Sequence, residues 1–242
     1  MPNWVTARIT LNGSEENVKK VLDFVRTDGV DENGKEYTLL FDFNKVIPMP
    51  EELNIESGSM GEWGMRYLLL NAKHKIAWSD SDYEFAQTME KRKAENEEDF
   101  NRMIDLGKKY LSNIAKYGYK DWYDWKCANH GTKWGACETE VNDNVVTFDT
   151  AWSFPHPVIK KLSEMFPDVV FEYIYADEDC GSNCSKGTYK NGEEGDDNEY
   201  PDTGSNRAYE IYLEVHPESA DDLIYDPDED TYKWRDFDEE NE

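Results

Sequence analysis

The chain has 242 residues, and its 53 acidic residues outnumber 26 lysines and arginines, which gives a formal net charge of −27. This length suits one large domain or one domain with an insertion. Basic side chains supply most non-specific affinity for phosphates, so the charge argues against direct binding to nucleic acid or to anionic membranes. No segment has the composition of a membrane span or a signal peptide, and four cysteines are too few for a disulfide scaffold. We therefore expect a cytoplasmic protein with reduced thiols.

The first fifty residues are predicted to form a strand, a helix and a second strand. Residues 4–11 are mostly β-formers, and Ser14 can cap a helix whose apolar residues recur at helical spacing to about Gly29. A second strand is predicted around residues 38–43. The prolines that follow end it, because proline cannot continue a ladder of backbone hydrogen bonds.

Residues 60–120 read as an inserted helical subdomain. A helix is predicted over residues 65–77. Three consecutive leucines in it are expected to be buried: Leu68, Leu69 and Leu70. The clearest amphipathic pattern of the chain runs from Phe100 to Ile114, with apolar residues at i, i+3, i+4 and i+7.

The second half repeats the strand–helix–strand order. Strands are predicted at Val145–Trp152 and Val169–Tyr175, with a helix that begins near Pro157 between them. Two such units match the split βαβ, or ferredoxin-like, arrangement. We therefore predict an α+β fold with a ferredoxin-like antiparallel sheet in residues 1–176, the helical insertion at 60–120, and an acidic C-terminal extension.

Residues 177–242 are predicted to pack on the same domain as an acidic loop, an edge strand and a tail. The loop is rich in Gly, Asp, Asn and Ser and has a short hairpin near residues 187–190. Alternating residues from Tyr209 to Val215 predict a half-buried edge strand. From Pro217 onward the tail has twelve acidic and two basic residues. Its aromatic residues favour a partly docked segment over a disordered one: Tyr225, Tyr232, Trp234 and Phe237.

The segment 122–152 contains four of the eight tryptophans and the most distinctive candidate site. Its candidate binding residues are Asn129, His130, Thr132, Lys133, Trp134 and Trp152. In the functional interpretation, Lys133 binds an anion, Trp134 and Trp152 supply stacking faces, and Asn129 offers hydrogen bonds. In the structural interpretation, the loop is a turn whose polar side chains satisfy backbone groups.

Other chemistries have weaker signals. The four cysteines, with His130 as a substitute ligand, lack the short-spaced pairs of zinc sites. Cys127 and His130 could form a nucleophilic pair, but no third orienting residue is evident. The run from Asp226 to Asp230 resembles a calcium loop without the sixth-position glycine, and Phe237 stands where the bidentate glutamate belongs. We therefore expect no metal, no cofactor and no catalytic residue, although an enzymatic role stays open.

Four strings of residues resemble the YubB-type ferredoxin-like family of bacteriophage and conjugative-plasmid proteins, a domain of unknown function. They are Met-Pro-Asn-Trp at residues 1–4, Val-Ile-Pro-Met-Pro-Glu at 46–51, Asn-x-Gly-Thr-Lys-Trp at 129–134, and Thr-Ala-Trp-Ser-x-Pro-x-Pro at 150–157. His130 departs from the tryptophan common at that position in the family, and the tail after Val215 has no counterpart that we can assign. The resemblance implies the fold and a mobile-element origin, and it implies no reaction.

We therefore expect an acidic, phage- or plasmid-encoded interaction protein with an anti-defence role in the host bacterial cytoplasm. It would bind a host protein with a basic surface, such as a defence or nucleic-acid-handling factor, by DNA mimicry. Tail residues would supply carboxylates and an aromatic anchor: Asp226, Asp228, Asp230 and Trp234. Two alternatives remain: a small-molecule or nucleotide binder or cryptic enzyme that uses the loop 129–134, and an RNA-binding module on the sheet. The sequence names neither the partner nor the oligomeric state.

Overall fold

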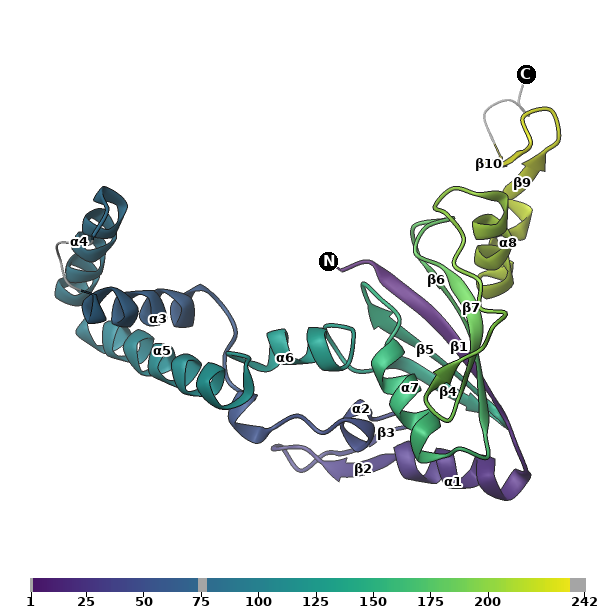
Figure 1. The fold of residues 1–242 in the computed structure, drawn as a ribbon, viewed down its shortest axis with the longest axis horizontal. Helices are drawn as coiled ribbons and strands as arrows, with labels where there is room; N and C mark the ends of the chain where they lie inside the picture. The colour runs from purple at the N-terminus through teal and green to yellow at the C-terminus, as the bar shows by residue number, and fades with distance from the viewer. Residues whose placement is uncertain (1, 74–77, 236–242) are drawn as a thin grey trace. The chain divides into compact units, whose positions relative to one another are not determined.

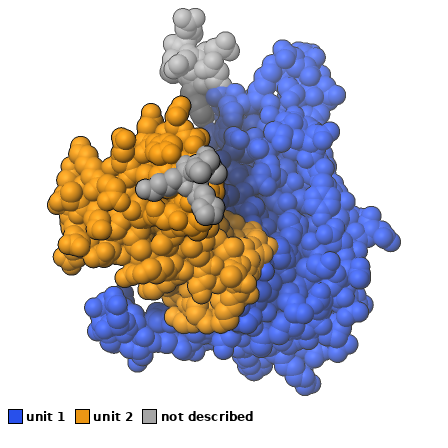
Figure 2. Space-filling view, turned by 60° about the vertical axis from the view of Figure 1, so that its left-hand side comes forward, with its two compact units in different colours: residues 1–48, 129–242 blue, residues 49–128 orange. Residues whose placement is uncertain are grey.

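The computed structural model describes residues 2–73 and 78–235. The chain divides into two compact units, which are coloured separately in Figure 2: residues 1–48 with 129–242 form unit 1, and residues 49–128 form unit 2. Unit 2 encloses the helical insertion predicted at 60–120. Within the described ranges, no helix is both long enough and apolar enough to cross a membrane.

Unit 1 is built on a six-stranded sheet with the order β4-β5-β1-β6-β7-β8, in which every neighbouring pair is antiparallel (Figure 1). Its strands are β1 (Trp4–Asn12), β4 (Cys137–Asn142), β5 (Val145–Ala151), β6 (Val170–Asp177), β7 (Ser185–Lys190) and β8 (Glu193–Glu194). The chain order β1-α1-β4-β5-α7-β6 with β1 between β5 and β6 is the split βαβ arrangement. The predicted ferredoxin-like antiparallel sheet is confirmed, and so is the hairpin expected near residues 187–190.

Helices cover one face of this sheet: α1 (Glu15–Val25), α2 (Phe43–Val46) and α7 (His156–Met165). The predicted cap of α1 is confirmed, because the Ser14 hydroxyl accepts a hydrogen bond from the backbone N–H of Asn17. Alternate residues of β1 point into this core and are at most 2% exposed: Val5, Ala7, Ile9 and Leu11. Burying each larger aliphatic side chain contributes about 1.5–3 kcal/mol, which fixes the register of the strand.

The strand predicted at residues 38–43 is correct only for Thr38 and Leu39, and it is not part of the six-stranded sheet. Residues 36–39 form β3 (Glu36–Leu39), which pairs with β2 (Thr27–Val30) in a separate two-stranded sheet. Because β2 begins at Thr27, α1 ends at Val25 and not near Gly29 as predicted. All four residues of β3 are exposed, so no hydrophobic pattern marks this hairpin. Phe41 and Phe43 leave the strand and enter the core with ring centroids 4.9 Å apart. The missing ferredoxin-like strand is β4, for which no strand was predicted from the sequence.

The edge strand predicted at Tyr209–Val215 is wrong, because this segment is part of the helix α8 (Asn206–Val215). The Ser205 hydroxyl caps the helix by accepting from the N–H of Ala208. Ala208, Ile211 and Tyr212 then recur at i, i+3 and i+4 and pack on the face of β6 opposite the α1–α7 layer. The apolar residues of this segment match the spacing of a strand as well as that of a helix. The Ser205 cap and the packing of residues at i, i+3 and i+4 favour the helix.

The described residues between 49 and 129 form a short 3₁₀ helix and four α-helices: η1 (Glu51–Leu53), α3 (Ser59–Ala72), α4 (Asp80–Glu95), α5 (Glu97–Tyr117) and α6 (Trp122–Asn129). The helix predicted at 65–77 therefore begins earlier and ends at Ala72, and residues 74–77 lie outside the described residues. Leu70 is buried as expected, whereas Leu68 is half-buried and Leu69 is exposed. The amphipathic pattern of α5 is confirmed at its centre, although Ile114 is exposed.

Candidate functional site

The predicted loop 129–134 is held to the end of β5 by hydrogen bonds from side chains to backbone carbonyls. The Thr132 hydroxyl donates to the Ala151 carbonyl at 2.6 Å, and the Ser153 hydroxyl donates to the Gly131 carbonyl at 2.5 Å. The His130 ring is 1% exposed, and its Nε2 atom lies 2.8 Å from the Ile47 carbonyl oxygen. Thr132 and His130 therefore act from inside the loop and fix its shape, while Asn129 ends α6 and is half-buried.

Lys133, Trp134 and Trp152 come together on the surface of this loop. The Lys133 ammonium lies 4.6 Å from the centroid of the Trp134 ring and 4.9 Å from that of the Trp152 ring. Trp4 extends the cluster, with its ring centroid 5.7 Å from that of Trp134. Trp152 is 41% exposed and has a φ of +73°, a strained value for a bulky residue. The three predicted residues thus form one cation–π cluster.

The C-terminal hairpin holds the other predicted residues. It consists of β9 (Leu223–Asp226) and β10 (Thr231–Trp234), preceded by the short 3₁₀ helix η3 (Pro217–Asp221). Leu223 is 3% exposed and Tyr232 packs beside it against α8, so these residues of the tail are docked on unit 1. Phe237 lies outside the described residues.

The structure gives the four predicted hairpin residues different roles. The Asp226 carboxylate accepts from the Asp228 N–H and from the Lys233 ammonium, each at 2.9 Å, which closes the turn. The Asp230 carboxylate accepts from the Tyr225 hydroxyl at 2.5 Å. The Asp228 side chain and the Trp234 ring are exposed, Trp234 by 55%. Asp226 and Asp230 therefore stabilise the hairpin, whereas the side chains of Asp228 and Trp234 lie on its surface.

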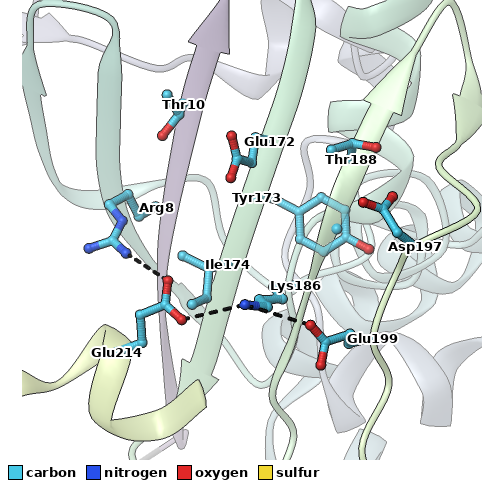
Figure 3. A pocket seen from close by; sticks show the side chains of 11 residues that line it. Arg8, Thr10, Glu172, Tyr173, Ile174, Lys186, Thr188, Asp197, Glu199 and Glu214 are labelled. Atoms are coloured by element: carbon cyan, nitrogen blue, oxygen red, sulfur yellow. Dashed lines mark ion pairs between the residues drawn. The ribbon is translucent and has the colours of Figure 1, made fainter. Parts of the chain in front are cut away.

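A pocket that the sequence analysis did not find lies on the sheet face shared with α8 (Figure 3). It has a volume of about 330 Å³ and takes its walls from β1, β6, β7, the segment after β8, and α8. Its side chains come from both ends of the chain, from Arg8 to Glu214, and Glu214 lies in the segment predicted as a strand. No local motif could therefore identify it.

Ion pairs cross one side of this pocket. Glu214 lies 3.7 Å from Arg8 and 3.7 Å from Lys186, and Lys186 lies 3.6 Å from Glu199 (Figure 3). The guanidinium of Arg207 also bonds Glu199 and lowers the pKa of that carboxyl. These contacts hold α8 and the segment after β8 against the open face of the sheet.

A cluster of tyrosines surrounds His156, the first residue of α7. Its Nδ1 atom lies 2.9 Å from the Tyr189 hydroxyl, which donates to Glu194 at 2.9 Å, and its Nε2 atom lies 3.3 Å from the Tyr175 hydroxyl. Burial lowers the pKa of His156, and the charge of Glu194 only partly opposes this. Burial also raises the pKa of Tyr175 to about 12. The histidine is thus held neutral inside a hydrogen-bonded network.

We expect His156 to contribute stability that is lost as the pH falls. Its pKa in the folded protein lies below the ordinary value of 6.5, so the unfolded chain takes up the proton first. The contribution is complete above pH 6.5 and decreases as the pH drops towards the folded-state pKa. Urea unfolding of the wild type and of His156→Gln at pH 7.5, 6.5 and 5.5 should show the difference in unfolding free energy shrinking. His216→Gln is the matched control, and parallel pH profiles of wild type and His156→Gln would contradict the assignment.

The cysteines form no disulfide. Among residues 2–73 and 78–235, no group of three or more His, Cys, Asp or Glu side chains is placed to hold a metal ion. Burial raises the pKa of Cys180 to about 11, so this thiol is protonated at neutral pH and is a poor nucleophile and metal ligand.

Comparisons with known proteins give one family. Residues 129–216 match the model of a family described as the ferredoxin-like domain in Api92-like protein. No curated protein matches the chain. The crystal structure of the protein Api92 from Yersinia pseudotuberculosis is similar with a TM-score of 0.40 and 11% identity, over 84% of this chain and 99% of that chain. The segment from β4 to α8 is thus similar to a ferredoxin-like domain of unknown function.

Proposed function

We propose that this chain is an acidic interaction protein, encoded by a phage or plasmid, that binds a basic surface of a host protein through its C-terminal hairpin. The observation that carries the proposal is the exposure of Trp234 and Asp228 on a hairpin that Leu223 and Tyr232 dock on α8. Tryptophan is among the commonest hot-spot residues of protein interfaces, and an anchored hairpin presents it at little cost in entropy.

Charge supports the same partner chemistry. Residues 177–235 have eighteen acidic and five basic residues, so the field around the hairpin and α8 is strongly negative. Such a field speeds encounter with a basic surface and rejects acidic ones. Protein surfaces that bind nucleic acid are basic. The partner class that we propose is therefore a nucleic-acid-handling protein of the host, such as a defence factor.

A second candidate function is the binding of a small anionic aromatic ligand, such as a nucleotide, at the loop 129–134. Trp152 favours it, because an exposed indole at a φ of +73° is a strained feature of the kind found at binding sites. Lys133 would then contact the anionic group and Trp152 the ring. Binding there would depend little on salt, since both contacts lie within a few ångströms.

Competition with DNA tests the proposed function. A partner identified by capture from host cells is purified and bound to a labelled duplex, and the acidic protein is then added. We expect it to displace the duplex, and its affinity for the partner to fall by about tenfold or more between 50 and 500 mM NaCl. Glu140→Gln, which removes one exposed charge from the far edge strand, should change neither result. Partner binding that leaves the duplex in place and persists in high salt would contradict mimicry.

A further inference from the structure

The pocket on the sheet face has a simple geometry. Arg8, Ile174 and Lys186 stand in one row across β1, β6 and β7. A second row, one pleat along the strands, places Glu172 between two threonines: Thr10 and Thr188. Neighbouring strands lie about 4.8 Å apart, so the three residues of this row are direct neighbours on one face of the sheet.

The two rows differ in charge balance. Glu214 of α8 spans the first row, pairing with both Arg8 and Lys186 (Figure 3). Glu172 in the second row accepts a hydrogen bond from the neutral Asn12 amide at 3.1 Å. In the described part of the chain, no ion pair includes Glu172 or Asp197. The second row and its neighbouring wall therefore contain two carboxylates without a basic counter-ion.

The pocket as a whole has a negative net charge. Four carboxylates and two basic side chains line it, so it has a net charge of −2. Its floor includes the apolar side chain of Ile174, which is 6% exposed. A ligand that suits this pocket has an apolar stem and a positive end with several N–H donors. The planar guanidinium of arginine supplies five donors and pairs with carboxylates more specifically than an ammonium does.

We propose that this pocket binds an arginine side chain of the partner protein, with Glu172 and Asp197 as counter-ions and the threonine hydroxyls as further acceptors. The inference rests on the proposed function. The link is α8, which carries Glu214 into the pocket and, at Asn206, donates a hydrogen bond to the Asp230 carbonyl of the hairpin at 3.0 Å. Eight residues of helix span about 12 Å, so one partner surface can contact both sites.

An arginine peptide tests the pocket directly. The probe is acetyl-Gly-Arg-Gly-amide, titrated into the full-length ¹⁵N-labelled protein and followed by NMR. We expect saturable shifts of the backbone amide signals of Glu172 and Thr188, with a dissociation constant in the millimolar range for a single side chain. The same peptide with neutral citrulline should cause no saturable shift, and the lysine peptide should bind more weakly.

Variants assign the counter-ions. In Glu172→Gln with Asp197→Asn, the arginine peptide should bind about tenfold more weakly or not saturate. Glu32→Gln with Glu140→Gln removes two exposed charges elsewhere in unit 1 and should bind it as the wild type does. Both replacements in the pocket keep the side-chain shape, and an unchanged pattern of remaining amide signals verifies the fold. No saturable shift with the wild type, or equal binding by the pocket variant, would overturn the inference. So would equal binding of the lysine peptide, or free arginine that binds ten times more tightly than the peptide.

The inference and the proposed function fail separately. A pocket variant that loses the peptide but binds the host partner as tightly as the wild type leaves the proposed function standing and overturns the arginine contact. A protein that binds the arginine peptide but never displaces DNA from a host protein leaves only the cation site. In both cases, Trp234→Ser should bind the peptide normally, because its side chain is not part of the pocket.

Discussion

Replacing Trp234 with serine is expected to weaken binding of the host partner by about 30-fold or more, while the free energy of unfolding changes by less than about 0.5 kcal/mol. Loss of an aromatic hot spot typically costs at least about 2 kcal/mol of binding free energy, which corresponds to that factor. The ring is 55% exposed in the unbound protein, so its removal loses little packing within the fold. Calorimetric titration and urea unfolding measure the two quantities.

Leu223→Ala is the matched variant in the same hairpin. Leu223 pairs directly with Trp234 across the two strands but is 3% exposed and packs on the α8 cluster. Its truncation should cost about 2–5 kcal/mol of stability. A deletion after Val215 would remove both side chains and mix the two effects. If Trp234→Ser destabilises the protein as much as Leu223→Ala does, the tryptophan is a structural residue and the hairpin is not the anchor.

The elements that the sequence predicted are those that bury one full face. β1, β5 and β6 alternate or run apolar, and α1 has a cap and a narrow apolar stripe, so the hydrophobic effect determines each of them locally. β4 is an edge strand with exposed acidic residues, a register shift between Cys137 and Glu140, and only half-buried inner positions. Its pairing depends on β5, which follows after the turn. The acidic residues that protect the edge from further pairing also remove the hydrophobic alternation by which a strand is predicted.

Only part of the candidate site could be predicted from the sequence. The loop 129–134 stood out because tryptophans and a lysine crowd a short segment, and Lys133, Trp134 and Trp152 do come together. The structural roles of His130 and Thr132 could not be predicted, because their hydrogen-bond partners are backbone carbonyls of distant segments. The pocket on the sheet face depends on the register between β1, β6 and β7 and on α8. That register is a property of the folded sheet, and a correct assignment of α8 was needed to place Glu214.

Gly64→Ala is expected to destabilise unit 2 by about 3 kcal/mol or more. On helix propensity alone the change should stabilise α3 by about 0.5–1 kcal/mol. A Cβ atom at Gly64, however, would lie 1.9 Å from the Met103 carbonyl oxygen and 2.7 Å from its carbon, both in the backbone of α5. A backbone cannot rotate away as a flexible side chain does, so the two helices must separate, and overpacking of this kind typically costs 1–3 kcal/mol or more.

Gly107→Ala should act in the same direction, because its Cβ atom would lie 2.4 Å from the carbonyl carbon of Gly64. Gly135→Ala in unit 1 is the control, since no atom lies within 4 Å of a Cβ added there. Hydrogen exchange followed by NMR reports the two units separately. Amides of α3 and α5 should exchange faster in Gly64→Ala, while those of β1 and β6 keep the protection of the wild type. Stabilisation by Gly64→Ala would contradict the close approach of α3 and α5. Equal loss of protection in β1 would show that residues 49–128 do not unfold on their own, and that the helical insertion is part of one cooperative domain.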